Sequence, residues 1–319
     1  MPVIPVCQSA TLEQMDQVGA HWPEAHLEAD EMAELAGAAY SVLGMDAVRV
    51  PFCQTVEAEA LGCEVKSGGS EHVPGIATHP VSAGQILTIP DDLLSRGRLP
   101  VVMEAVRKLK LSLGDKVAII GGVVGPFTLA GSLLGTKVML IQAMKNPGAL
   151  APILDVCQQV GTSVAGALVE AGADIICVED MAASPELISP SLYVGLVYPH
   201  HRRLFAGIKV PAILHICGDV SSTVEQMAST GAAALSYEGK IHKSIVESGV
   251  RDRVALITGP DPASTLATET PDDVERQCLD ILELGVDILA PGCAVATSTP
   301  SENLLAMGNV VERYCRHWR

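Results

Sequence analysis

Short apolar runs rich in valine and isoleucine alternate along the chain with longer stretches in which apolar residues recur at helical spacing. This alternation is typical of βα units that build a parallel sheet. Eight runs have the length of a buried strand, and we expect strands at residues 3–7, 47–52, 117–121, 174–178, 212–216, 233–237, 254–258 and 286–290. Each run is followed by at least one helical pattern, so the sequence predicts a (β/α)8 TIM barrel.

An open, doubly wound sheet is the main alternative to the barrel. That fold carries a glycine-rich phosphate-binding turn after its first strand, and no such turn follows residues 3–7. The glycines at positions 121, 122 and 125 have the wrong spacing for a dinucleotide-binding turn. We therefore expect a barrel, whose functional residues lie at the carboxyl ends of its strands.

Helical spacing predicts helices over residues 28–43, 99–111 and 189–206, further helices after Pro90 and between residues 125 and 171, and a loop through Trp22 before the first helix. Residues 57–87 lack such spacing and contain Gly68, Gly69, Pro74 and Pro80. We expect this stretch to be an insertion at a strand end, such as a hairpin lid. Residues 1–319 are otherwise expected to form a single barrel domain.

The composition argues against several classes of function. The net charge of −16, with only Arg49 and Lys66 as cationic side chains before Arg96, disfavours a nucleic-acid partner, because phosphate binding needs a basic surface. The most apolar run, residues 117–134, is interrupted by glycines and Pro126, so no membrane span is expected. The N-terminus lacks the basic and apolar segments of a signal peptide, and we expect a cytoplasmic protein.

Two of the expected strands end in histidine or cysteine. His215 and Cys217 lie two residues apart at the end of one strand, and Cys293 follows the last strand. Residues i and i+2 of a strand point to the same side, so His215 and Cys217 can present an imidazole and a thiolate to one ion. With Cys293 they form a His/Cys/Cys set that suits zinc and leaves a fourth position for a substrate.

The alternative is that these cysteines only fill the core. The nine cysteines lack the spacing of a disulfide framework, which indicates reduced thiols, and buried cysteines usually act as packing residues. We expect that packing role for Cys7, Cys53 and Cys177. A His-x-Cys pattern is short, and what favours a metal site is that both stretches are apolar strands ending at the same edge of a barrel.

Charged side chains at other strand ends are further candidates. Glu238 can reach the ion as an exchangeable oxygen ligand or remain a solvated carboxylate at the rim. Asp180 can bind substrate, support a metal ligand or cap a helix. Arg49 can pair with a substrate anion or with a neighbouring carboxylate. Glu238, Asp180 and Arg49 are therefore the predicted catalytic residues.

Five stretches carry a resemblance to a known family. They are His215-x-Cys217, the Pro-Gly-Cys293 turn, and the segments at residues 125–130, 178–185 and 22–26. Together they resemble the methylcobamide:coenzyme M methyltransferases, a branch of the uroporphyrinogen decarboxylase superfamily. The resemblance implies a (β/α)8 barrel with zinc bound by His215, Cys217 and Cys293. It also implies a carboxylate, at the position of Glu238, that occupies the fourth site before the substrate arrives.

The resemblance also implies a reaction. A free thiol has a pKa of about 8.5, whereas a thiol bound to a divalent metal is deprotonated and nucleophilic. In the family, a small acceptor thiol such as coenzyme M takes the methyl group of a methylcobamide, which is carried by a partner corrinoid protein. Residues 57–87 are expected to contact that methylated corrinoid protein, and Arg49 to bind the sulfonate of coenzyme M.

Other functions in the same superfamily stay open. A decarboxylase or other lyase is disfavoured, because the arginine-bearing N-terminal motif of the true decarboxylases is missing and Arg49 alone is too little positive charge for a porphyrinogen. A corrinoid methyltransferase with a folate or homocysteine acceptor is the second alternative. A non-enzymatic scaffold for a corrinoid protein is disfavoured, because all three expected metal ligands are present.

Overall fold

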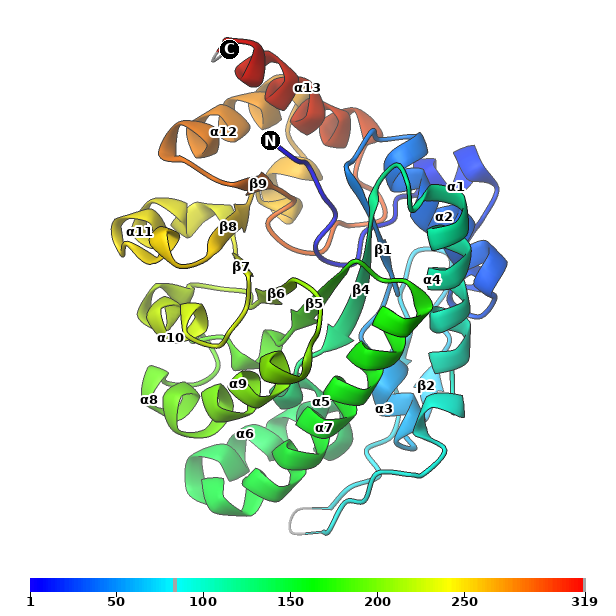
Figure 1. Cartoon of the computed structure of the whole chain (residues 1–319), viewed down its shortest axis with the longest axis vertical. Coiled ribbons are helices and arrows are strands. Elements are labelled where there is room, and N and C mark those ends of the chain that lie inside the picture. The colour runs from blue at the N-terminus through cyan, green and yellow to red at the C-terminus, as the bar shows by residue number, and fades with distance from the viewer. Residues whose placement is uncertain (83–84, 318–319) are drawn as a thin grey trace.

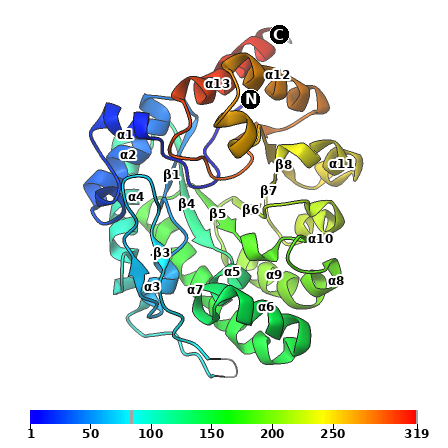
Figure 2. The same cartoon turned by 180° about the vertical axis from the view of Figure 1, so that it is seen from behind.

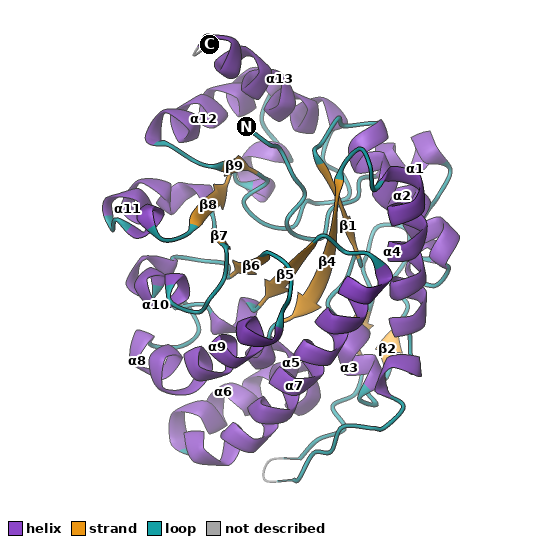
Figure 3. Cartoon of the chain, in the orientation of Figure 1, coloured by secondary structure: helices purple, strands orange, loops and turns teal. Residues whose placement is uncertain are grey.

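Seven parallel strands form a curved central sheet, and helices cover its outer face (Figure 1, Figure 3). The computed structural model describes residues 1–82 and 85–317, with side chains up to residue 314. The strands are neighbours in space in their chain order, β1 (Ala47–Val50), β4 (Ala118–Val124), β5 (Ile175–Glu179), β6 (Ala212–His215), β7 (Ala234–Ser236), β8 (Ala255–Thr258) and β9 (Ile288–Leu289). Since every neighbouring pair is parallel, all the carboxyl ends lie at one edge.

The N-terminal segment, blue in Figure 1, runs between β9 and β1 and closes the sheet into a barrel. Val3 forms a parallel bridge with Leu289 on β9, and its carbonyl accepts a hydrogen bond of 2.8 Å from the N–H of Asp46, just before β1. The strand expected over residues 3–7 is reduced to this single bridge. Pro5 explains the shortening, because it has no N–H with which to continue the ladder.

Helices pack against the outside of the barrel. They are α1 (Leu12–Val18), α2 (Ala29–Ser41), α3 (Val56–Ala60), α4 (Leu99–Leu113), α5 (Pro126–Leu134), α6 (Thr136–Lys145), α7 (Pro147–Ala171), α8 (Pro190–Leu192), α9 (Tyr198–Gly207), α10 (Val224–Ala228), α11 (His242–Glu247), α12 (Pro271–Leu284) and α13 (Ser301–His317). A π-helical turn at Tyr193–Val197 joins α8 to α9. Because α3 to α13 follow the strands in turn, the chain shows the strand–helix alternation that the apolar pattern predicts.

Helix α1 occupies part of the stretch for which a loop was expected. Its amino end is a capping box, in which the Thr11 hydroxyl accepts a hydrogen bond of 3.2 Å from the N–H of Gln14. The Gln14 side-chain oxygen in turn accepts one of 3.0 Å from the N–H of Thr11. The Thr-x-x-Gln spacing is a known signal of a helix start, so the sequence did contain the information.

The stretch at residues 57–87 is not a wholly irregular insertion. It begins inside α3 and contains an antiparallel hairpin of β2 (Val65–Lys66) and β3 (Gly75–Ile76). The described residues that follow the hairpin, 77–82 and 85–90, extend away from the barrel (Figure 1, Figure 2). After Pro90 the structure has only a short 3-10 turn, Leu93–Ser95, in place of the expected helix.

Two layers of side chains fill the inside of the barrel. The lower layer is apolar and includes Ala47, Ile120, Cys177, Ile213 and Ala234. Two residues further along each of these strands, on the same face, lie Arg49, Gly122, Glu179, His215 and Ser236. The upper layer is therefore polar and lies at the carboxyl ends of the strands.

Among the described residues, no single helix is long and apolar enough to cross a membrane. Helices α5 and α6 satisfy the length and composition criteria only together, and they are bent by 113° at the break between them. Most residues of α5 are buried against the protein itself.

Candidate metal centre

His215, Cys217 and Cys293 meet at the carboxyl end of the barrel. His215 is the last residue of β6, Cys217 follows two residues later, and Cys293 lies in the turn after β9. The Nε2 atom of His215 is 3.2 Å from the Sγ atom of Cys217, which is 3.2 Å from the Sγ atom of Cys293. His215 is fully buried, whereas both cysteines are partly exposed. The three side chains can therefore contact one cation that a substrate can still reach.

The two sulfur atoms differ in proton affinity. The hydrogen bond with Cys293, followed by burial and by the charges of Cys293 and Glu238, raises the pKa of the Cys217 thiol. The same hydrogen bond, with a second one from Cys7, lowers the pKa of the Cys293 thiol. A thiolate is the form of cysteine that binds a metal, and two sulfurs with one imidazole suit a borderline-soft divalent cation.

Ser236 fixes the orientation of the His215 ring. The two residues are register partners on β6 and β7, and the Nδ1 atom of His215 lies 2.9 Å from the Oγ atom of Ser236. A proton on Nδ1 that is donated to the hydroxyl leaves the Nε2 lone pair directed at the cysteines. The sequence analysis did not identify Ser236 as a site residue. The only signal was that residues at matching positions on neighbouring strands point to the same side of the sheet.

Cys7 also faces this cluster, although we expected it to be a packing residue. The ligand atoms of Cys7, His215 and Cys293 all lie within 4.8 Å of one another. Cys7 is 3% exposed, and burial, followed by its hydrogen bond with Cys293, raises the pKa of its thiol. The sequence signal was its place at the carboxyl end of the strand expected over residues 3–7, and barrel closure brings it beside the turn after β9.

Glu238 lies at the edge of the cluster. One carboxylate oxygen accepts a hydrogen bond of 2.7 Å from the N–H of Gly218, and the other pairs with the Nζ atom of Lys240 at 2.5 Å. Its charge contributes to the raised pKa of Cys217, which places it near the sulfur atoms. Both oxygens are thus engaged by neighbours other than the three expected metal ligands.

Arg49 lies inside the barrel and pairs with a carboxylate. Its guanidinium group donates hydrogen bonds to the side chain of Glu179 and to the carbonyl of Pro51, and both charged side chains are almost fully buried. A Cβ atom on Gly122 would lie 2.4 Å from Nη2 of Arg49, so this glycine makes room for the ion pair. Of the two kinds of partner expected for Arg49, the structure contains the neighbouring carboxylate.

Asp180 holds the amino end of α5. Its fully buried carboxylate accepts hydrogen bonds from the N–H groups of Phe127 at 3.0 Å and Thr128 at 2.7 Å, and from the Thr128 hydroxyl at 2.7 Å. The Nε2 atom of His201 lies 2.8 Å away. Helix capping is one of the roles expected for Asp180, and it acts here on the helix that follows β4.

The turns after β7, β8 and β9 touch through their backbones. A Cβ atom on Gly239 would lie 2.1 Å from the carbonyl oxygen of Gly259, and one on Gly259 would lie 1.9 Å from the carbonyl oxygen of Ala290. Only glycine permits such an approach at these two positions. The turn that carries Cys293 is therefore positioned by direct contact between main chains.

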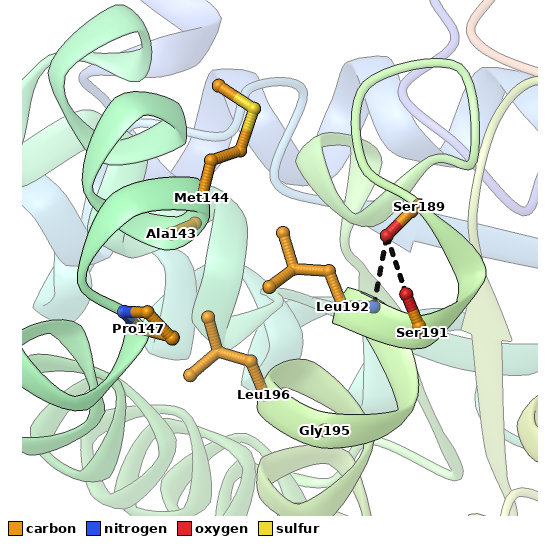
Figure 4. Close-up of a pocket in the computed structure, with 8 residues that line it drawn as sticks. All are labelled: Ala143, Met144, Pro147, Ser189, Ser191, Leu192, Gly195 and Leu196. Carbon is orange, nitrogen blue, oxygen red and sulfur yellow. Dashed lines mark hydrogen bonds between the residues drawn. The ribbon is translucent and has the colours of Figure 1, made fainter.

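A surface hollow of about 440 Å³ lies between the α6–α7 corner and α8 (Figure 4). Its lining is mainly apolar, and the hydroxyl groups of Ser189 and Ser191 lie 3.0 Å apart, with the Leu192 N–H donating to Ser189 (Figure 4). The lining contains neither a charged side chain nor a thiol. The chemistry of the molecule is therefore expected at the barrel mouth rather than in this hollow.

Comparison with known proteins places this barrel in a family. Residues 1–314 match the uroporphyrinogen decarboxylase (URO-D) family. Methylcobamide:CoM methyltransferase MtaA of Methanosarcina barkeri is 37% identical over 316 residues, which are 98% of this chain and 93% of that protein. The chain belongs to the URO-D family, in its methylcobamide:coenzyme M methyltransferase branch. MtbA of Methanosarcina acetivorans, also named a methylcobamide:CoM methyltransferase, is 34% identical over 98% of this chain and 93% of its own.

A solved structure agrees with this assignment. A methyltransferase from Methanosarcina mazei superposes on this chain with a TM-score of 0.95 and 36% identity, over 98% of this chain and 94% of that one. Uroporphyrinogen decarboxylases are more distant, for example 26% identical over 73% of this chain for the protein of Nitrosospira multiformis. The barrel and the family predicted from the sequence are confirmed.

Proposed function

We propose that this protein is a zinc-dependent methyltransferase that moves a methyl group from a methylated corrinoid to a thiol acceptor such as coenzyme M. The observation that carries the proposal is the convergence of His215, Cys217 and Cys293 at the barrel mouth, with nitrogen–sulfur and sulfur–sulfur distances of 3.2 Å. The names of relatives that align over nearly the whole chain supply the reaction class.

His215, Cys217 and Cys293 would hold the metal. Zinc bound there would supply a Lewis acid that keeps an acceptor thiol in its nucleophilic thiolate form. The protein contributes Ser236, whose hydroxyl orients the imidazole ring through Nδ1, and a buried wall around His215 that limits solvent access. Cys217 and Cys293 are partly exposed, so an acceptor thiol would approach the metal from their side.

The three charged residues predicted as catalytic are proposed to act in different ways. Glu238 remains our prediction for an exchangeable oxygen ligand, which would have to leave Gly218 and Lys240 to reach the metal. Asp180 is proposed to act by positioning α5 at the mouth. Arg49 is proposed to shape the floor of the site through Glu179, and any sulfonate contact would compete with that pair.

The methyl donor is proposed to arrive on a separate corrinoid protein. The hairpin β2–β3 follows β1 at the carboxyl edge of the sheet, and the described residues around it, 57–82 and 85–87, lie beside the barrel (Figure 1). Such a segment offers contact surface beside the mouth without filling it. Coenzyme M is the acceptor we favour, because it appears in the names of relatives at 37% and 34% identity.

The experiment compares Cys217→Ala and Cys293→Ser with Cys278→Ser, which changes a fully buried cysteine of α12. Zinc content is measured by elemental analysis, and activity by transfer from free methylcobalamin to coenzyme M. We expect both site variants to lose zinc and thiol methylation together, and the control to keep both. Stoichiometric zinc in a purified Cys217→Ala/Cys293→Ser double variant would contradict the proposed site.

A further inference from the structure

Exposed apolar side chains gather on α6 and on the segment that faces it. Val138, Ile141 and Met144 lie three residues apart on α6, so they share one side of that helix, and Met144 is 67% exposed. Leu187 and Val194 are exposed on the opposite segment. We call α6 and residues 187–196, with the hollow between them, the α6–α8 patch. Contiguous exposed apolar surface of this kind marks a contact with another molecule.

The α6–α8 patch is poor in carboxylates, although the protein is strongly acidic. Residues 117–154 contain no aspartate or glutamate, and residues 187–199 contain no charged side chain, in a chain of net charge −16. Lys137 and Lys145 are exposed near the two ends of α6. An apolar centre with cationic edges complements a protein surface that has an apolar centre and an acidic rim.

The α6–α8 patch lies at the same end of the barrel as the expected metal ligands. Helices α7 and α9 each lead to the next parallel strand, so they begin at the carboxyl edge of the sheet and end at the amino edge. The hollow lies between the start of α7 at Pro147 and the segment before α9, from which Leu192 and Leu196 point across it (Figure 4). It therefore lies on the rim of the mouth, behind β5, the neighbour of the strand that carries His215.

The segment that follows the β2–β3 hairpin is attached to the corner between α5 and α6. The Nδ1 atom of His79 lies 2.7 Å from the carbonyl oxygen of Ser132, and the N–H of Val81 donates to the carbonyl of Leu133 at 3.2 Å. A Cβ atom on Gly135, which separates the two helices, would lie 3.2 Å from the His79 ring. The hairpin region and the α6–α8 patch therefore adjoin on the rim.

We propose that the α6–α8 patch docks the corrinoid protein that carries the methyl donor, through an apolar surface of that protein with a rim of carboxylates. The inference rests on the proposed function and names the surface that its protein partner occupies. A donor protein must sit on the mouth side of the barrel to bring its cobamide to the metal, and the patch lies there outside the site itself. A second copy of this chain fits less well, because a symmetric contact would bring Lys137 and Lys145 of both copies together.

The experiment compares two methyl donors, free methylcobalamin and a methylated corrinoid protein purified from the source organism by the visible absorbance of its cobamide. In Met144→Asp we expect kcat/KM for the protein-bound donor to fall roughly 10- to 100-fold, as for a central interface residue. The value for free methylcobalamin should not change, because a free cobamide needs no docking surface on the rim. Leu111→Asp, at an 89% exposed position of α4, should leave both values unchanged.

Charge reversal tests the cationic edges separately. Lys137→Glu/Lys145→Glu should slow association with the corrinoid protein roughly 10-fold at low ionic strength and weaken its dependence on salt. The matched control is Lys116→Glu/Lys209→Glu, which changes the net charge equally at exposed positions before β4 and β6, on the opposite edge of the sheet. This control should associate at nearly the unaltered rate.

Equal kcat/KM values of Met144→Asp and Leu111→Asp with the protein-bound donor would overturn the docking assignment. A dimer of the unaltered protein that becomes a monomer in Met144→Asp, seen by light scattering, would assign the patch to a second copy instead. Binding of the unaltered protein, but not of Met144→Asp, to anionic phospholipid vesicles would assign it to a lipid surface. These results leave transfer from free methylcobalamin intact, whereas its absence in the unaltered protein would overturn the proposed function itself.

Discussion

The Nδ1 atom of His215 lies 2.9 Å from the Oγ atom of Ser236, its register partner on the neighbouring strand. We predict that Ser236→Ala lowers zinc affinity roughly 10- to 100-fold, the usual effect of removing a group that orients a metal-bound histidine. Without the hydroxyl, the ring is free to change tautomer and to rotate. Chelator competition measures the effect, with Ser163→Ala on the surface of α7 as control. Equal affinities in the two variants would contradict this role.

Replacing Arg49 by methionine is expected to destabilise the protein by about 3–5 kcal/mol, because it leaves the buried Glu179 carboxylate without its cationic partner. The double variant Arg49→Met/Glu179→Gln should recover part of this loss, since no uncompensated charge remains. Urea unfolding of the three proteins provides the measurement. If the single variant is as stable as the unaltered protein, the ion pair does not stabilise the floor of the site. A rise in KM confined to anionic thiols would instead assign Arg49 to the acceptor.

We predict that Asp180→Asn costs about 2–3 kcal/mol of folding free energy. The amide has one acceptor oxygen in place of two, so it cannot satisfy the N–H groups of Phe127 and Thr128 together with His201. The loss of negative charge at the amino end of α5 acts in the same direction. Thermal or urea unfolding checks the value against Asp272→Asn, an exposed first-turn residue of α12. Similar losses of stability in both variants would mean that the buried contacts of Asp180 with α5 stabilise the protein no more than an exposed carboxylate does.

His26 predicts a pH dependence of stability. The ring is fully buried against Trp22, with ring centroids 4.8 Å apart, and neither nitrogen has a hydrogen-bond partner among the described residues. Burial, followed by the positive charge of Arg98, lowers the pKa of His26 to about 3 from its ordinary value of 6.5. Between these values the unfolded chain binds the proton and the folded chain does not. Stability is therefore fully present above about pH 6.5 and declines toward pH 3, by up to about 1.4 kcal/mol per pH unit for this group.

Unfolding of the metal-free protein between about pH 4 and pH 7 measures that slope. Replacing His26 by phenylalanine should make it shallower, whereas His72→Gln, at an exposed position, should leave it unchanged. Some slope is expected to remain, because burial also lowers the pKa of His242, to about 4. A His26→Phe variant with the full slope would show that other groups cause the acid sensitivity.

Most of the barrel could be predicted because its strands are buried on both faces and read as uninterrupted apolar runs. The exception is the N-terminal run, in which Pro5 removes a donor and only Val3 remains paired. The short helix α1 offered too few apolar positions for a periodicity argument, and its evidence was the Thr11 and Gln14 capping box. Local hydrogen bonding determined both the shortened N-terminal strand and helix α1. A pattern of apolar positions contains no information about hydrogen bonds.

The site could be predicted only in part, for a geometric reason. The i, i+2 spacing of His215 and Cys217 at a strand end indicated one pair, although β6 itself ends at His215, and the common edge of parallel strands brings Cys293 to them. The proximity of Cys7 follows from barrel closure, and the pairing of Arg49 with Glu179 joins residues 130 positions apart. Such contacts depend on which strands become neighbours and on how far each side chain reaches, and neither is written in a single stretch of sequence.

The main-chain contacts of Gly239, Gly259 and Ala290 make one side of the barrel mouth rigid. A wall made of stacked peptide groups has no rotamers to change, so it cannot adapt to a differently shaped guest and must exclude or admit it as it stands.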